Sequence, residues 1–196
     1  MPFCVWQVST SNIHLKTHFV ISNHFGQLGL GKDFPEGGTA VFLANNYLRC
    51  AANLVNNSKE PLSVASVKCG DSYSVVLLSN GKVIVFGHTF YGQCGVANTN
   101  ESAWFPQLLD PEAVFLNRKI IKIFCGLNYT MFIDELYDCW TCGENANNQL
   151  MQGEEMKRVM APTRVVFNHG CAVPFDQVEY VICLDISIFI TRKCQL

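Results

Sequence analysis

The feature that most constrains the fold of this chain is an internal repeat. The interval from Cys69 to Cys125 equals the interval from Gly92 to Asn148. Between these landmarks the residue types follow the same order in both copies. A strand-rich repeat of roughly 40–60 residues, punctuated by turns, indicates propeller blades or a solenoid.

The clearest unit occupies residues 63–110. Its expected strands are 64–68, 73–78, 82–86 and 105–109. The two middle runs are apolar on both faces, which is typical of strands covered from two sides. Asn80-Gly81 predicts a hairpin turn, because both central residues tolerate positive φ. Phe105-Pro106 predicts an outer strand, where a proline removes no ladder bond.

The same order continues on both sides of this unit. Further strands are expected at 120–124, 129–133, 137–141, 163–167, 180–183 and 186–190. Residues 3–31 contain a degraded first unit, and the extra length before the next one falls in 32–62. We therefore predict an all-β chain, a partial β-propeller of about three four-stranded blades plus part of a fourth. The array covers 1–196, with repeats at roughly 3–62, 63–118, 119–177 and 178–196.

Several short segments recur in fixed order within the units. They are the turns Gly70-Asp71-Ser72-Tyr73-Ser74 and Gly126-Leu127-Asn128-Tyr129-Thr130, the pairs Phe86-Gly87 and Cys142-Gly143, and the segments Gly26-Gln27-Leu28-Gly29, Gly92-Gln93-Cys94-Gly95 and Asn148-Gln149-Leu150-Met151. Together they resemble the repeat of the regulator of chromosome condensation family over roughly residues 19–190. Tyrosine stands where that family has histidine in the first turn, and its tryptophan before glycine is absent.

The glycines and asparagines of these segments are expected to be structural. The set is Gly26, Gly29, Gly70, Asn80, Gly81, Gly87, Gly92, Gly95, Gly126, Gly143 and Asn148. Such residues allow tight turns and close packing of one blade on the next. Asn148 replaces a glycine, and asparagine is the best substitute in left-handed backbone.

The composition excludes several classes of function. A net charge of −2 and the lack of a basic run argue against a nucleic-acid surface. No apolar segment is long enough for a membrane helix, and the N-terminus does not resemble a signal peptide. The ten cysteines are spread through apolar runs, so we predict free thiols and a cytoplasmic or nuclear location.

Two sequence patterns that suggest chemistry are weak. Cys139 and Cys142 form a Cys-x-x-Cys pair, but on a strand the two side chains face opposite sides. His169 and Cys171 lack the second ligand pair of a zinc site. We therefore predict no metal, no cofactor, no catalytic residue and no enzyme activity of the hydrolase or transferase type.

Candidate binding residues lie in the loops that follow the third strand of each unit. They are His88, Phe90, Tyr91, Glu144, Asn145 and Asn147. Loops on a rigid scaffold often carry binding, and an aromatic pair can anchor a partner. The alternative is that Phe90 and Tyr91 only pack against the next blade.

The resemblance implies a protein-interaction scaffold. The alternative is a guanine-nucleotide exchange factor or regulator of a small GTPase, since the family's founder has that activity. Tyr47 to Glu60 is a conceivable wedge for such a role and otherwise a longer loop. The ring is expected to be incomplete. The first and last units could form one composite blade, two chains could join at their open edges, or the sequence could be part of a longer protein.

Overall fold

The computed structural model describes residues 23–33, 63–96, 102–153, 155–166, 178–183 and 187–191. The expected strands before residue 22, the segment 47–60 and the pair His169 and Cys171 lie outside these residues. No helix in the described ranges is long and apolar enough to cross a membrane.

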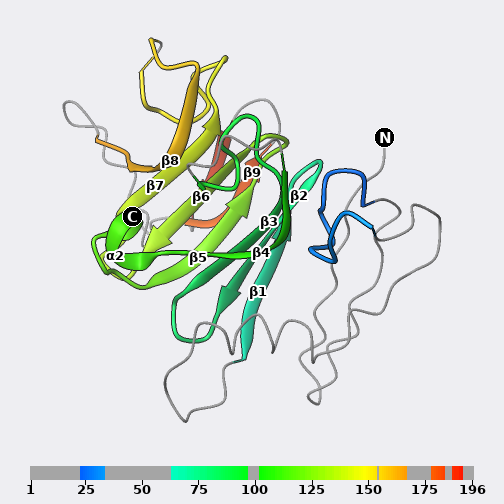
Figure 1. Cartoon of the computed structure of the whole chain (residues 1–196). Helices are drawn as coiled ribbons and strands as arrows, with labels where there is room; N and C mark the ends of the chain where they lie inside the picture. Colours follow the sequence, from blue (N-terminus) through cyan, green and yellow to red (C-terminus); the bar gives the residue numbers. More distant parts are fainter. Residues whose placement is uncertain are drawn as a thin grey trace, which may run out of the picture.

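The described strands form two four-stranded antiparallel sheets and one two-stranded sheet (Figure 1). The first blade consists of β1 (Val64–Cys69), β2 (Tyr73–Leu78), β3 (Val83–His88) and β4 (Ser102–Leu109). The second blade consists of β5 (Ile120–Cys125), β6 (Tyr129–Asp134), β7 (Cys139–Glu144) and β8 (Arg158–Arg164). A further pair follows, β9 (Val178–Cys183) and β10 (Ser187–Thr191). In each blade the strands pair in sequence order, which confirms the predicted partial all-β propeller.

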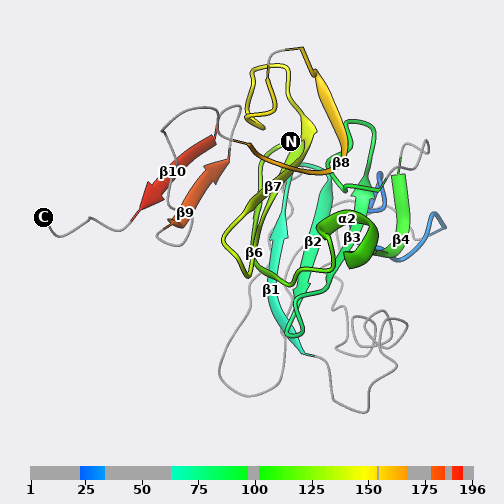
Figure 2. The ribbon, with the colours of Figure 1, turned by 90° about the vertical axis from the view of Figure 1, so that its left-hand side faces the viewer.

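The strand pairing repeats with the sequence period. Tyr73 lies opposite Gly87 in the first blade, and Tyr129 lies opposite Gly143 in the second. The first strands of successive sheets are neighbours, since β1 contacts β5 and β5 contacts β9. In Figure 2 the two blades stand side by side with their strands running in similar directions.

The outer strands differ most from the expectation. β4 begins at Ser102 rather than at residue 105, and β8 spans 158–164 rather than 163–167. Both outer strands contain a register shift, between Val85 and Gly87 on the β3 side and between Thr141 and Gly143 on the β7 side. Pro106 and Pro162 therefore lie inside β4 and β8, near a bulge at the sheet edge, instead of at the start of the strand.

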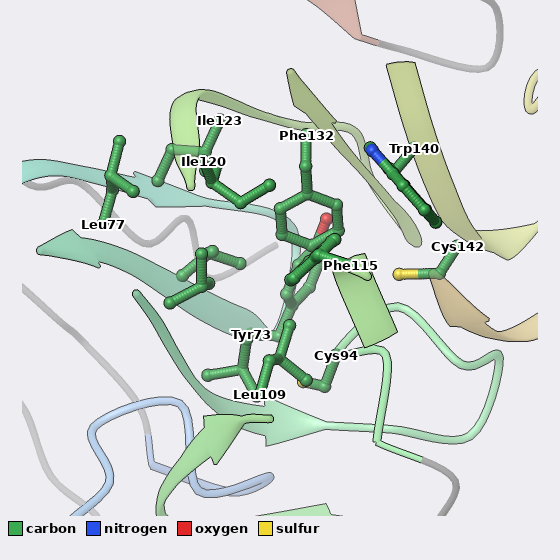
Figure 3. Packing of buried hydrophobic residues seen from close by; sticks show 13 residues of the cluster. Tyr73, Leu77, Cys94, Leu109, Phe115, Ile120, Ile123, Phe132, Trp140 and Cys142 are labelled. Atoms are coloured by element: carbon green, nitrogen blue, oxygen red, sulfur yellow. The ribbon is translucent and has the colours of Figure 1, made fainter. Parts of the chain in front are cut away.

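The middle strands are covered on both faces, as their apolar runs predicted. All six residues of β2 and all six of β6 are buried. On one side of β2, Tyr73, Val75 and Leu77 join a cluster that also contains Ile123 and Phe132 of the second blade (Figure 3). This cluster is the interface that joins the two blades.

A short helix that the sequence did not predict, α2 (Pro111–Phe115), connects the blades. The side chain of Asp110 caps it by accepting a hydrogen bond of 3.0 Å from the backbone N–H of Glu112. Phe115 is buried, and its ring lies 5.2 Å from that of Phe132 and 5.7 Å from that of Trp140. Phe115 thus brings the helix into the interface between the blades, where its ring lies beside that of Phe132 (Figure 3).

Candidate protein-binding face

One loop structure occurs three times, at 23–31, 89–95 and 145–151. Each copy consists of two consecutive turns. In the second copy the N–H of Gly92 donates to the carbonyl of Thr89 and the N–H of Gly95 donates to the carbonyl of Gly92, each at 2.8 Å. In the third copy Asn148 and Met151 occupy the two glycine positions with φ of 57° and 58°. The period that relates the sequences therefore relates the backbones as well.

A glutamine fixes the tip of each loop from inside. The side-chain Oε1 of Gln27, Gln93 and Gln149 accepts a hydrogen bond from the backbone N–H two residues earlier, at 2.9, 2.9 and 2.8 Å. All three glutamines are buried. The residues whose N–H groups are held are Phe25, Tyr91 and Asn147. Backbone held in this way presents the neighbouring side chains on a rigid support.

The first two loops also dock on the following blade. Ser74 Oγ donates to the carbonyl of Gln27 at 2.9 Å, and Thr130 Oγ1 donates to the carbonyl of Gln93 at 2.6 Å. Gly92 has a φ of 86°, and a Cβ there would lie 2.6 Å from the carbonyl oxygen of Val159 in β8. The loop of one unit and the outer strand of the next are therefore in direct backbone contact.

Tyr73 connects the two blades through hydrogen bonds of its hydroxyl. Its hydroxyl donates to the backbone carbonyl of Gly126 at 3.2 Å and also contacts the carbonyl of Tyr129. Burial, and secondarily the nearby Cys125, raise the pKa of Tyr73 well above its ordinary value, so the hydroxyl stays a proton donor. A Cβ at Gly70 would overlap the Tyr73 ring. The tyrosine that replaces the family's histidine thus needs glycine beside it.

The outward side of the first two loops carries an aromatic strip, formed by His24, Phe25, His88, Phe90 and Tyr91. Neighbouring ring centroids lie 4.6 Å apart for Phe25 and His88, 6.2 Å for His88 and Phe90, and 5.0 Å for Phe90 and Tyr91. Phe90 is 45% exposed and His24 is exposed as well. The strip therefore runs continuously from one loop to the next.

Arg158, at the start of β8, extends the strip onto the second blade. Its guanidinium carbon lies 4.5 Å from the ring centroid of Phe90 and 5.5 Å from that of Tyr91. Phe90 and Tyr91 consequently contact the next blade and remain partly accessible, and their binding of a partner stays a prediction.

The three candidates in the third loop have different roles. Asn145 is fully buried. Its side chain accepts from the N–H of Leu150 at 2.9 Å and donates to the carbonyls of Gly153 and Met156 at 2.9 and 2.6 Å. The expectation that Asn145 faces a partner is therefore wrong, because the loop uses all of its polar atoms. Glu144 is half-buried and accepts from Asn128 at 3.1 Å, and Asn147 is exposed.

The expected turn residues fall into two groups. Positive φ is found at Gly26, Gly29, Gly81, Gly87, Gly92, Gly95, Gly143 and Asn148. Gly70 and Gly126 instead make room for the rings of Tyr73 and Tyr129. Asn80 does not have positive φ. Its side chain accepts from the N–H of Lys82 at 3.1 Å, and Gly81 alone takes the left-handed conformation of a three-residue hairpin loop.

The thiols in the described residues are structural. Cys139 and Cys142 lie in different apolar clusters, on opposite faces of β7, as the spacing predicted. Burial raises the pKa of Cys94 and of Cys142, so neither is a reactive thiolate. Cys69, Cys94, Cys125, Cys139 and Cys142 are all free. Within the part of the chain that the structure describes, no group of three or more His, Cys, Asp or Glu could hold a metal ion.

Comparison with known proteins agrees with the repeat geometry. Residues 80–133 match the family profile "Regulator of chromosome condensation (RCC1) repeat", and residues 64–93 match a second profile of the same description. A structure of yeast RCC1 (Prp20) bound to Kap60 superposes with a TM-score of 0.64 at 15% identity, over 88% of this chain and 37% of the other. Residues 64–133 therefore match RCC1-type repeats, and the chain has a propeller-type fold.

Two relatives show how much of a larger protein the chain resembles. It is 26% identical over 141 residues to the X-linked retinitis pigmentosa GTPase regulator homolog of Caenorhabditis elegans, covering 72% of this chain and 9% of the relative. It is 27% identical over 109 residues to the ultraviolet-B receptor UVR8 of Arabidopsis thaliana, covering 54% of this chain and 24% of the relative. The chain thus spans less than a quarter of the length of either relative.

Two members of the strip, His24 and Phe25, and the arginine that extends it were not predicted from the sequence. Phe25 and His24 occupy the positions of Tyr91 and Phe90 in the first loop, so the alignment of Gly26 with Gly92 was a signal for them. Arg158 had no such signal, because the contact depends on how β8 of one blade lies against the loop of the previous one.

Proposed function

We propose that the chain is a protein-interaction module of the RCC1-repeat type, and that the aromatic strip is its binding face. The proposal rests on one observation: partly exposed aromatic rings stand on loops whose backbone is held by the buried side chains of Gln27 and Gln93. Aromatic side chains on a pre-organised surface bind with little loss of conformational entropy and dominate the energetics of protein interfaces. The glutamine-held loops provide that pre-organisation.

Other features of the chain also support a binding role. Buried polar side chains such as Ser74 and Thr130 serve contacts between a loop and the next blade. The net charge of −2 favours a protein partner over nucleic acid. Free cysteines suit the cytoplasm or nucleus, the location that we propose.

The test compares two exposed apolar positions at opposite ends of the blades. Partners captured by the immobilised chain would be purified, and their affinities measured for the wild type, Phe90→Ala and Leu136→Ala. Leu136 is 63% exposed and lies in the β6–β7 turn, at the end of β7 away from the loops. We expect Phe90→Ala to remove ~2 kcal/mol or more of binding free energy, as at an interface hot spot. Equal affinities of all three proteins would contradict the proposal.

A second candidate function is regulation of a small GTPase. It is supported by the relative named as a GTPase regulator homolog. The corresponding assay is the release of a fluorescent guanine nucleotide from a panel of small GTPases. Faster release that persists in Phe90→Ala would favour this function through a different surface, whereas no effect on any member would argue against it.

A further inference from the structure

The aromatic strip ends at a cation, the guanidinium of Arg158. Arg158 is exposed and makes no ion pair with any residue that the structure describes. The nearest acid in the strand pairing is Glu144, directly opposite Arg158 in β7 and β8. The carboxylate of Glu144 is instead bound by the side-chain amide of Asn128. The guanidinium carbon of Arg158 lies over the rings of Phe90 and Tyr91.

This geometry prepares the guanidinium for an anion. A cation–π contact uses none of the N–H donors of the guanidinium as hydrogen bonds, so they remain available to an acceptor. The planar fork matches a carboxylate, which it can bind with two parallel hydrogen bonds. Contact with two rings also restricts the side chain, so less entropy is lost when the anion binds.

We infer that Arg158 reads a carboxylate side chain in an extended peptide segment of the partner, while apolar side chains of the same segment pack on the aromatic strip. This inference rests on the proposed function and assigns the chemistry of the ligand. A peptide fits better than a nucleic acid, since one arginine and a chain of net charge −2 provide little phosphate attraction. The continuous line of rings from Phe25 to Tyr91 suits an extended segment with several apolar contacts.

The probe is a phage-displayed library of random linear peptides, selected on the wild-type chain. The affinity of each selected peptide for Phe90→Ala is then measured, and a weaker affinity than for the wild type shows that the peptide contacts the strip. For each strip-dependent peptide, affinity is measured with its acidic residues in place and with each replaced by the matching amide, on wild type, Arg158→Lys and Arg158→Gln. Since Arg158 is exposed on an outer strand, these variants are expected to fold, and Leu136→Ala is the surface control.

We expect the strip-dependent peptides to contain an Asp or Glu whose amide form binds on the order of tenfold to a hundredfold more weakly, as for a charge-assisted hydrogen bond. Arg158→Gln should weaken the acidic peptide similarly and erase the difference between acid and amide. Arg158→Lys should recover only part of the loss, because it keeps the charge without the fork.

Three results would overturn the inference. Strip-dependent peptides that are indifferent to both Arg158→Gln and the amide exchange would refute the carboxylate reading and leave the proposed function standing. Failure to find any Phe90-dependent peptide would refute both. Binding of a fluorescent oligouridine through Arg158, with no acidic peptide bound, would assign the site to a nucleic acid instead.

Discussion

Gly92→Ala tests whether the blades are held together by close backbone contact. Gly92 lies in the loop of the first blade and faces β8 of the second. A Cβ at this position would be 2.6 Å from the carbonyl oxygen of Val159 and 2.7 Å from the Cα of Met160. Both are backbone atoms of a paired strand, so neither can move away by a rotamer change.

Gly153 is a matched control in the same chain. Its φ is also 86°, but a Cβ there would meet nothing within 4 Å. Alanine at either site carries the left-handed cost of about 1–2 kcal/mol. The lower entropy of the unfolded chain returns about 0.4–1 kcal/mol. Gly153→Ala should therefore lower the free energy of unfolding by about 1 kcal/mol.

At Gly92 the steric overlap adds to this common cost. Overpacking in a well-packed interior typically costs about 1–3 kcal/mol, so Gly92→Ala should lose about 2–4 kcal/mol in total. Urea denaturation followed by tryptophan fluorescence measures both. With an m value of about 2 kcal/mol/M, the two midpoints should differ by about 1 M. Equal midpoints would show that backbone strain alone makes these glycines necessary and that the contact with β8 contributes nothing.

Three other substitutions test separate parts of the structure. Tyr73→Phe removes the buried hydroxyl that donates to the carbonyl of Gly126 in the second blade, so we expect a loss of about 1–3 kcal/mol in urea unfolding, whereas Tyr91→Phe on the surface should change little. Tyr137, with φ of 63°, occupies the place of Gly81 in the second hairpin and is exposed; Tyr137→Gly should leave the melting temperature unchanged or raise it, and a clear fall would contradict the strain argument. Burial alone would raise the pKa of Asp134, but hydrogen bonds from Trp140, Arg118 and two backbone N–H groups outweigh it and lower the pKa below its ordinary value. The stability that this carboxylate contributes is therefore present above a pH of about 4 and lost as the pH falls through the lower folded pKa. When the free energy of unfolding is measured against pH, Asp134→Asn should reduce its fall at acidic pH. The same fall in the variant and the wild type would refute this role.

The sequence predicted the parts of the fold that repeat. The period located β1–β3 and β5–β7 because each copy confirmed the other, and burial on both faces followed from the apolar runs. The period could not give the outer strands their starts. The expected strands began at residues 105 and 163, whereas β4 and β8 begin earlier and each contains a proline, Pro106 or Pro162, near its register shift. α2 was missed although Asp110-Pro111 is an ordinary helix-start pair, because so short a helix shows no helical periodicity.

The Asp134 network shows a different limit. Asp134 stands one repeat period after Leu78, so the repeat alone predicts a buried apolar side chain. The carboxylate is buried and accepts from Trp140 at 2.9 Å and Arg118 at 3.0 Å. Arg118 follows α2, which has no counterpart in the described part of the preceding unit. The sequence shows that Asp134 departs from the repeat. It does not show which groups bond to the buried carboxylate, because Arg118 reaches it from the connection between the blades only in the folded chain.

Each repeat loop has positions that face the protein interior and positions that face outward, and the candidate site lies at the outward positions. Positions facing inward keep their chemistry, since Gln27, Gln93 and Gln149 make the same bond in all three loops. Positions facing outward do not, because the place of Phe90 and Tyr91 is taken by Ala146 and Asn147 one unit later. Residues that hold the loop are constrained by its hydrogen bonds and by the neighbouring blade, whereas the outward residues differ from loop to loop. An array of such units can therefore acquire an aromatic strip on two loops and end it at the third without any change in the scaffold, and Arg158, on the strand that supports the third loop, closes the strip with a charge.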